Sequence, residues 1–221
     1  QMDELSSAIL AFQKLLNAYA SSEFRSSALY EVANAYYTLG DYPTAAQEYR
    51  QFIQGFPDDS NMPQALLNYG ECLLRLEDAN GANKIFNRIL QQYPNSPQAA
   101  QAGMLVGETF VIQQQCDKAE QVYAPVISGG DRILAAQAQM SLARCYERTA
   151  DLEKAVTEYL KMIYLYSEQK DFVDQETYAA ATIYEQLGRV PEARNLYQKL
   201  VNTAITPEII EQARNKLQKL Q

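Results

Sequence analysis

The sequence predicts an all-α, right-handed superhelical solenoid of antiparallel helix pairs, with about 12 helices. When the sequence is aligned with itself as repeats, one column of the alignment holds an alanine that stands four residues before an aromatic residue. This pair occurs six times, at intervals of 37, 37, 37, 36 and 38 residues. A second column holds a small residue followed three residues later by an aromatic residue or leucine. The first column is Ala8/Phe12, Ala45/Tyr49, Ala82/Phe86, Ala119/Tyr123, Ala155/Tyr159 and Ala193/Tyr197, and the second is Ala33/Tyr36, Gly70/Leu73, Gly107/Phe110, Ala143/Tyr146 and Ala181/Tyr184.

Each period reads as two helices, as residues 26–57 illustrate. Leu29, Val32 and Tyr36 recur at three- and four-residue steps, which is the helical period. Gly40 then ends the first helix, since glycine is favoured just past a helix C-terminus. A second amphipathic run follows until Pro57 stops it. One such pair cannot bury its own apolar face, so neighbouring pairs must stack.

The same reasoning, applied along the chain, predicts every element. The predicted helices are 3–20, 24–39, 42–56, 61–76, 79–93, 97–114, 116–128, 131–149, 152–169, 171–187, 190–203 and 206–220. They form a single solenoid over 1–221, with an incomplete repeat at 1–23, repeats at 24–59, 60–96, 97–130, 131–170 and 171–204, and a capping helix at 205–221.

The two ends of the array have special signals. The first helix has the register of the second helix in a pair and lacks its partner, so we expect this chain to be a slice of a longer array. At the other end, Thr206 suits a helix N-cap and Pro207 the first helical position. The glycine-rich segment 128–131 reads as a helix stop followed by an Asp131 N-cap, because no strand and no lysine support a phosphate-binding loop.

The repeat pattern of this sequence resembles that of the tetratricopeptide repeat (TPR) family over nearly the whole chain. The matching positions are Leu29, Val32, Ala33, Tyr36, Gly40, Asp41, Tyr42, Ala45, Tyr49, Phe52 and Pro57, then Leu66, Gly70, Leu73, Ala82, Phe86, Ile89 and Pro94. Gly103, Gln139 and Thr177 depart from the pattern, since a large apolar residue usually opens the first helix there. Repeat ends such as 93–99 resemble a bacterial envelope subgroup of cell-division coordinators and β-barrel assembly lipoproteins. That resemblance implies the periplasm or cell envelope, and the cytoplasm stays open as the alternative.

Composition argues against several classes of function. The net charge of −8 disfavours nucleic acid, and no cluster of lysine and arginine reverses it locally. The chain has no histidine, which removes the commonest general base and zinc ligand. We therefore expect no enzyme activity, no metal and no cofactor. The apolar runs are too short for a bilayer, so we also expect no direct membrane insertion.

The three cysteines are expected to be small, partly buried apolar residues. They are too few and too scattered to predict a disulfide framework or a zinc site. Cys72 and Cys145 occupy the same position two repeats apart, beyond disulfide reach, and Cys116 begins a second helix.

The resemblance also implies where a partner would bind. In this fold the first helices of successive pairs line a concave groove with their fifth, ninth and twelfth repeat positions. We call the residues at these positions the groove residues: Tyr30, Asn34, Tyr37, Leu67, Glu71, Leu74, Met104, Glu108, Val111, Met140, Arg144, Glu147, Tyr178, Thr182 and Glu185. The fifth position is always apolar and forms a stripe, either an exposed contact surface or packing between neighbouring helices.

The leading hypothesis is a non-catalytic scaffold that binds a peptide or helical segment of a partner in this groove. Its glutamates favour a neutral or basic, partly apolar segment. Chaperone-docking relatives bind a carboxylate with lysine, asparagine and arginine, and only Asn34 and Arg144 fit by type, so acidic tails are disfavoured. The alternative is a structural module that packs against other domains or self-associates through its first helix.

Overall fold

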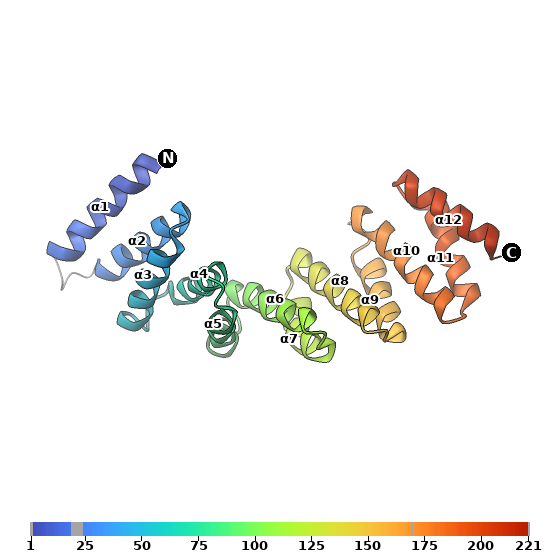
Figure 1. Ribbon diagram of the computed structural model, residues 1–221, viewed down its shortest axis with the longest axis horizontal. Coiled ribbons are helices and arrows are strands. Elements are labelled where there is room, and N and C mark those ends of the chain that lie inside the picture. The colour runs from blue at the N-terminus through green and yellow to red at the C-terminus, as the bar shows by residue number, and fades with distance from the viewer. Residues whose placement is uncertain (1, 19–23, 169, 221) are drawn as a thin grey trace. The chain divides into compact units, whose positions relative to one another are not determined.

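The computed structural model describes residues 2–18, 24–168 and 170–220, and these residues form twelve α-helices and no strand (Figure 1). The helices are α1 (Met2–Ala18), α2 (Arg25–Leu39), α3 (Tyr42–Gly55), α4 (Met62–Arg75), α5 (Ala79–Gln92), α6 (Pro97–Ile112), α7 (Cys116–Ser128), α8 (Arg132–Arg148), α9 (Leu152–Leu165), α10 (Lys170–Gln186), α11 (Val190–Thr203) and α12 (Pro207–Lys219). The predicted all-α solenoid class is confirmed.

The chain forms two compact units, residues 1–106 and 107–221, and their boundary falls inside α6. In unit 1, α1 packs on α2, α2 on α3, α3 on α4 and α4 on α5. In unit 2 the same succession runs from α7 to α12. The repeat boundaries and their union in a single solenoid over 1–221 stay a prediction.

Most helix ends lie within two residues of the predicted ones. The largest difference is at α9, which ends at Leu165 rather than at residue 169, because Tyr166 caps the helix and a turn follows. Asp131 is an N-cap as predicted, and its side chain accepts hydrogen bonds from the amides of Ile133 and Leu134 at 3.0 and 3.1 Å. Thr206 occupies the N-cap position of α12, although its side chain makes no capping hydrogen bond.

The turn between the two helices of a pair has the same backbone conformation five times. In each turn one residue has a positive φ, and the residues are Gly40, Glu77, Gln114, Ala150 and Gly188. Such a left-handed residue closes a helix by turning the chain so that the next amides bond back to the last carbonyls. For example, the amide of Asp41 donates to the carbonyl of Tyr36 at 3.0 Å. Only two of the five residues are glycine, so glycine marks this turn in the sequence of two pairs and not in the other three.

A buried small residue of the first helix and a buried aromatic residue of the second helix recur together in every helix pair. The small residue of the second column is followed sixteen residues later by the aromatic residue of the first column in all five pairs. The pairs are Ala33/Tyr49, Gly70/Phe86, Gly107/Tyr123, Ala143/Tyr159 and Ala181/Tyr197, and all ten residues are buried. A Cβ atom added at Gly70 or Gly107 would overlap the facing ring, so alanine at either position would require the ring to shift.

Two departures from the repeat pattern are polar groups that are satisfied inside unit 2. Gln139 is buried, and its side-chain amide donates to the carboxylate of buried Glu158, which also pairs with Lys161 at 2.8 Å. The buried hydroxyl of Thr177 donates to the carbonyl of Val173 at 2.6 Å. Because buried polar groups are costly only when they lack partners, the fold tolerates these substitutions.

The first helix packs on one side only, within the part of it that is described. Ile9 is buried against the rest of unit 1, whereas Leu10 is 59% exposed. The expected continuation of this helix through residues 19 and 20 lies outside the described residues.

Overpacking a helix crossing should reveal the register directly. Ala82 is fully buried in α5, and Ala82→Leu should lower the free energy of unfolding by ~1–3 kcal/mol because the larger side chain has no space. Gln92 is exposed near the end of the same helix, and Gln92→Leu should change stability by less than about 0.5 kcal/mol. Urea denaturation of both variants checks this, and equal losses would contradict the register.

Candidate functional site

The groove residues divide between the two units. Those of α2 and α4 and Met104 of α6 belong to unit 1, and those of α8 and α10, with Glu108 and Val111, belong to unit 2.

The apolar stripe in unit 1 is only partly accessible. Leu67 and Met104 are buried, with 2% and 8% of their surface exposed, so they pack between neighbouring helices. Tyr30 is half-buried, with its ring 5.4 Å from that of Phe52. Leu74 is the most exposed apolar member, at 39%. The packing interpretation therefore holds at the fifth positions of α4 and α6, and the accessible apolar groups of unit 1 are tyrosine and leucine at the edges.

A chain of hydrogen-bonded side chains crosses the same face of unit 1. The hydroxyl of Tyr49 donates to Asn34 Oδ1 at 2.6 Å, and the side-chain amide of Asn68 donates to the Tyr49 hydroxyl at 2.8 Å. Gln64 donates to Asn68 at 2.7 Å, and Gln98 donates to Gln64 at 2.9 Å. Each amide keeps further donor or acceptor capacity beyond these bonds. This surface is therefore an ordered row of uncharged polar groups running from α2 to α6.

Glu71 is the charged groove residue of unit 1. Tyr37 donates its hydroxyl to Glu71 Oε2 at 2.5 Å, which links α2 to α4. Burial raises the pKa of Tyr37, and the hydrogen bond to the carboxylate raises it further. The carboxylate therefore has a fixed position while its second oxygen remains free of this bond.

The groove residues of unit 2 are strongly charged. Arg144 of α8 pairs with the buried Glu176 of α10 at 2.7 Å. Glu185 of α10 pairs with Lys216 of α12 at 3.0 Å. Glu108 and Glu147 are exposed, whereas Met140, Tyr178 and Thr182 are half-buried. Carboxylates outnumber cations on this face.

Tyrosines of the second helices hold several groove residues in place. These are aromatic rings of the first column, and the hydroxyls of Tyr49, Tyr159 and Tyr197 lie beside a ninth or twelfth position, whereas the hydroxyl of Tyr123 is buried. Tyr159 donates to Glu147 at 2.6 Å, and Tyr197 donates to Glu185 and lies 3.2 Å from the Thr182 hydroxyl. Burial, followed by the hydrogen bond to the carboxylate, raises the pKa of both tyrosines. The core residue that fixes the helix crossing therefore also orients the groove.

Sequence reasoning missed several of these partners. The amides of Asn68, Gln64 and Gln98, and the carboxylate of Glu176, lie outside the fifth, ninth and twelfth positions. A usable signal was present in the aromatic column, because it is tyrosine in four of the five complete pairs and a buried tyrosine needs a partner for its hydroxyl.

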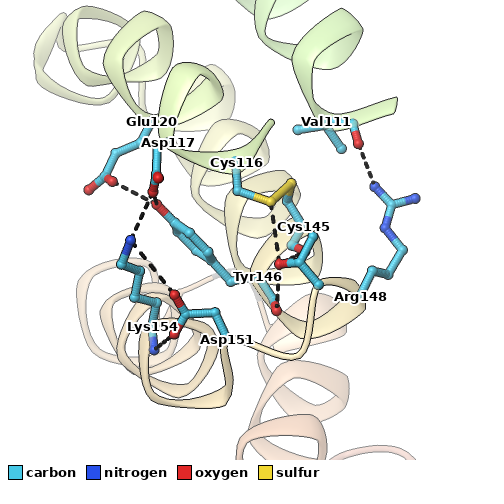
Figure 2. The surroundings of a disulfide bond; sticks show 10 residues. Val111, Cys116, Asp117, Glu120, Cys145, Tyr146, Arg148, Asp151 and Lys154 are labelled. Atoms are coloured by element: carbon cyan, nitrogen blue, oxygen red, sulfur yellow. Dashed lines mark hydrogen bonds and ion pairs between the residues drawn. A yellow bond between two sulfur atoms is a disulfide. The ribbon is translucent and has the colours of Figure 1, made fainter. Parts of the chain in front are cut away.

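The expectation that the cysteines are unpaired is wrong for two of them. Cys116 and Cys145 form a disulfide with a Cα–Cα distance of 5.7 Å, as Figure 2 shows. The register explains the pairing, because the first residue of α7 lies against the helix that opens the next repeat. Cys72 and Cys145, which share one repeat position, are not bonded to each other. Cys72 is a free, buried thiol, and burial raises its pKa to about 12.

Within the described residues, no three side chains of histidine, cysteine, aspartate or glutamate are arranged to hold a metal ion. None of the described helices combines the length and apolar character needed to span a bilayer.

Comparison with known proteins identifies the family. A tetratricopeptide repeat model matches residues 1–60, 30–97 and 98–170, and a second tetratricopeptide repeat model matches 178–204. The chain belongs to the tetratricopeptide repeat family. This TPR chain has no significant match among curated proteins.

Solved structures share the fold of this TPR chain at low sequence identity. A tetratricopeptide repeat protein from Parabacteroides merdae ATCC 43184 has a TM-score of 0.63 and 14% identity, covering 98% of this chain and 80% of that one. YrrB, described as a TPR protein with an unusual peptide-binding site, has a TM-score of 0.64 and 15% identity, covering 93% and 98%. MamA has a TM-score of 0.63 and 18% identity, covering 84% and 100%.

The buried carboxylate of Glu176 should make stability depend on pH. Burial raises its pKa although Arg144 beside it acts in the opposite direction. Because the folded state then binds the proton more tightly than the unfolded state, stability falls as pH rises from the unfolded pKa through the folded pKa. Glu176→Gln removes this loss, so its melting temperature relative to wild type should increase from pH 4 to pH 7.

Thermal melts at several pH values measure this difference. Arg144→Gln is the matched control, since removing the cation should raise the pKa of Glu176 further and steepen the pH dependence. A Glu176→Gln variant that is equally destabilised at every pH would contradict the argument.

Proposed function

We propose that this chain is a non-catalytic protein-interaction scaffold whose accessible groove residues bind a neutral or basic, partly apolar segment of a partner. The observation that carries the proposal is the pre-ordered polar surface described above, in which core tyrosines and cross-helix hydrogen bonds hold the groove side chains before any partner arrives. Such preorganisation lowers the entropic cost of binding.

Each unit, taken by itself, favours a different feature in a bound segment. The amide row of unit 1 suits the backbone of an extended peptide, because amide side chains both donate and accept hydrogen bonds. Tyr30 and Leu74 at its edges supply apolar contact. In unit 2, the exposed Glu108 and Glu147 favour lysine or arginine in the partner. The likeness to YrrB, which has a peptide-binding site, supports a peptide as the class of ligand.

Selection from a displayed library of random 15-residue peptides tests the proposal. The recovered peptides should carry a net positive charge and aliphatic or aromatic residues. Glu108→Lys should weaken their binding about tenfold or more and flatten its salt dependence, because it replaces attraction with repulsion on an exposed surface. Isothermal titration at two salt concentrations measures both effects.

Glu211→Lys is the matched control, since it makes the same change of charge on the exposed side of α12. It should leave peptide affinity within about twofold of wild type. Failure to recover any peptide, or equal effects of the two variants, would contradict groove binding.

A second candidate function is self-association through the first helix. The observation that favours it is Leu10, a large apolar side chain that is 59% exposed on α1. If copies of the chain pack across this helix, sedimentation velocity over a concentration range should show a dimer. Leu10→Lys should raise the dissociation constant of that dimer at least tenfold. A chain that stays monomeric at all concentrations would exclude this function.

We also propose that the protein works in an oxidising compartment such as the bacterial envelope, the location that its repeat ends resemble. The supporting observation is the Cys116–Cys145 disulfide, because such bonds persist in oxidising compartments and are rare in reducing ones. Thiol labelling of cells before lysis tests this: the two cysteines should be unlabelled in the protein from its native source.

A further inference from the structure

We infer that the Cys116–Cys145 disulfide is a permanent staple of unit 2, shielded from thiol exchange while the unit is folded. The inference does not depend on the proposed binding function. It rests on the position of the two cysteines in the repeat, on the burial of both sulfur-bearing residues and on the side chains around them.

The bond replaces an apolar contact at a joint between repeats. Cys116 is the first residue of a second helix, and Cys145 lies on the first helix of the next repeat, two residues beyond the small residue Ala143. At the next joint of unit 2 the same two register positions hold Leu152 and Ile183. The disulfide thus occupies the positions that hold large aliphatic side chains at the neighbouring joint. We therefore interpret the disulfide as a structural bond.

Polar side chains reinforce the same joint, as Figure 2 shows. The hydroxyl of Tyr146 donates to Glu120 at 2.7 Å and to Asp117 at 3.1 Å, while Lys154 pairs with Asp117 at 2.8 Å. These contacts connect α7 with α8 and with α9. On the other side of the bond, Arg148 donates to the carbonyl of Val111 at 3.1 Å. The disulfide therefore lies inside a set of contacts that hold its two helices together.

The chemistry of exchange explains why the bond should resist reductants. A thiolate attacks one sulfur and expels the other as a thiolate, and a sulfur of lower pKa leaves faster. One route expels Cys116, the first residue of α7, as the thiolate. Its departure requires attack on Cys145, which is fully buried.

The reverse attack is also unfavourable. Cys116 is 5% exposed and lines a surface cavity of about 450 Å³ with Gln114, Thr149 and neighbouring residues. An attacker that reached it there would have to expel Cys145 as a thiolate into the interior, where burial disfavours the charged form. Both routes therefore require the joint to open first.

Formation of the bond is a balanced two-electron oxidation. The two thiols lose two protons and two electrons as the S–S bond forms, and the acceptor is a disulfide of the thiol-oxidoreductase class, which is reduced to two thiols. Cys72 does not compete in this exchange, because it is fully buried and its pKa is raised to about 12. The chain therefore has one possible intramolecular product in the folded state.

Thiol counting on protein produced in an oxidising compartment tests the inference. Alkylation in denaturant should label Cys72 alone, and a peptide linking Cys116 to Cys145 should appear on digestion without reductant. Dithiothreitol should reduce the bond at least tenfold more slowly in native buffer than in urea. Three labelled cysteines, or equal rates of reduction, would overturn the inference.

The stabilising effect needs a separate measurement. Wild-type protein reduced in urea, alkylated and refolded should melt about 5–15 °C below the oxidised protein, because the cross-link restricts the unfolded chain. Cys116→Ala with Cys145→Ala should melt near the reduced protein, whereas Cys72→Ser should keep the slow native reduction. If the double variant does not fold, the comparison of reduction rates still decides, and identical melting of the oxidised and reduced protein would exclude a staple.

Discussion

The contact between a small residue and an aromatic ring at each helix crossing is the constraint on which the rest of the structure depends. The ring can cross closely over the first helix only where that helix offers alanine or glycine, as at Gly70 beneath Phe86. The spacing of sixteen residues then fixes the length of chain between the two contact points, which comprises the end of the first helix, the turn and the start of the second helix. Tyr49, Tyr159 and Tyr197 also place a hydroxyl beside a groove residue of the first helix. Core packing and the orientation of the polar face are consequently one arrangement.

The repeats nevertheless differ in the side chains that they present at the groove positions. Where the ring is Phe86, no hydroxyl is available, and Glu71 instead receives one from Tyr37 of the preceding repeat. Unit 1 displays neutral amides, whereas unit 2 displays carboxylates with a minority of cations. Repeat proteins can vary surface residues independently along the array, since each repeat contacts only its neighbours. Here that independence yields two surfaces of different chemistry on one scaffold.

The fold was predictable from the sequence because its signals are local and repeated six times. Helix ends followed from glycine, proline and aspartate, and from the alanine column. The accessibility of the fifth positions was not predictable, since Leu67 and Met104 are buried although Tyr30, at the same repeat position, is only half-buried. The disulfide required knowing which residues meet across a joint between repeats, and the partners of Arg144 and Asn34 required the same three-dimensional information.

The constant spacing within each helix pair also indicates where the chain can accommodate change in length. The intervals between successive small residues vary from 36 to 38, so all of that variation falls between the aromatic residue of one pair and the small residue of the next. Among the segments that leave a second helix, Gly129–Gly130 after α7 is exposed and carries no part of the crossing contact, whereas Tyr166 after α9 is buried. Insertions, tags or grafted recognition loops therefore belong at Gly129–Gly130. In the tight turns inside each pair, by contrast, an added residue would rotate the aromatic ring away from the small residue on which it packs.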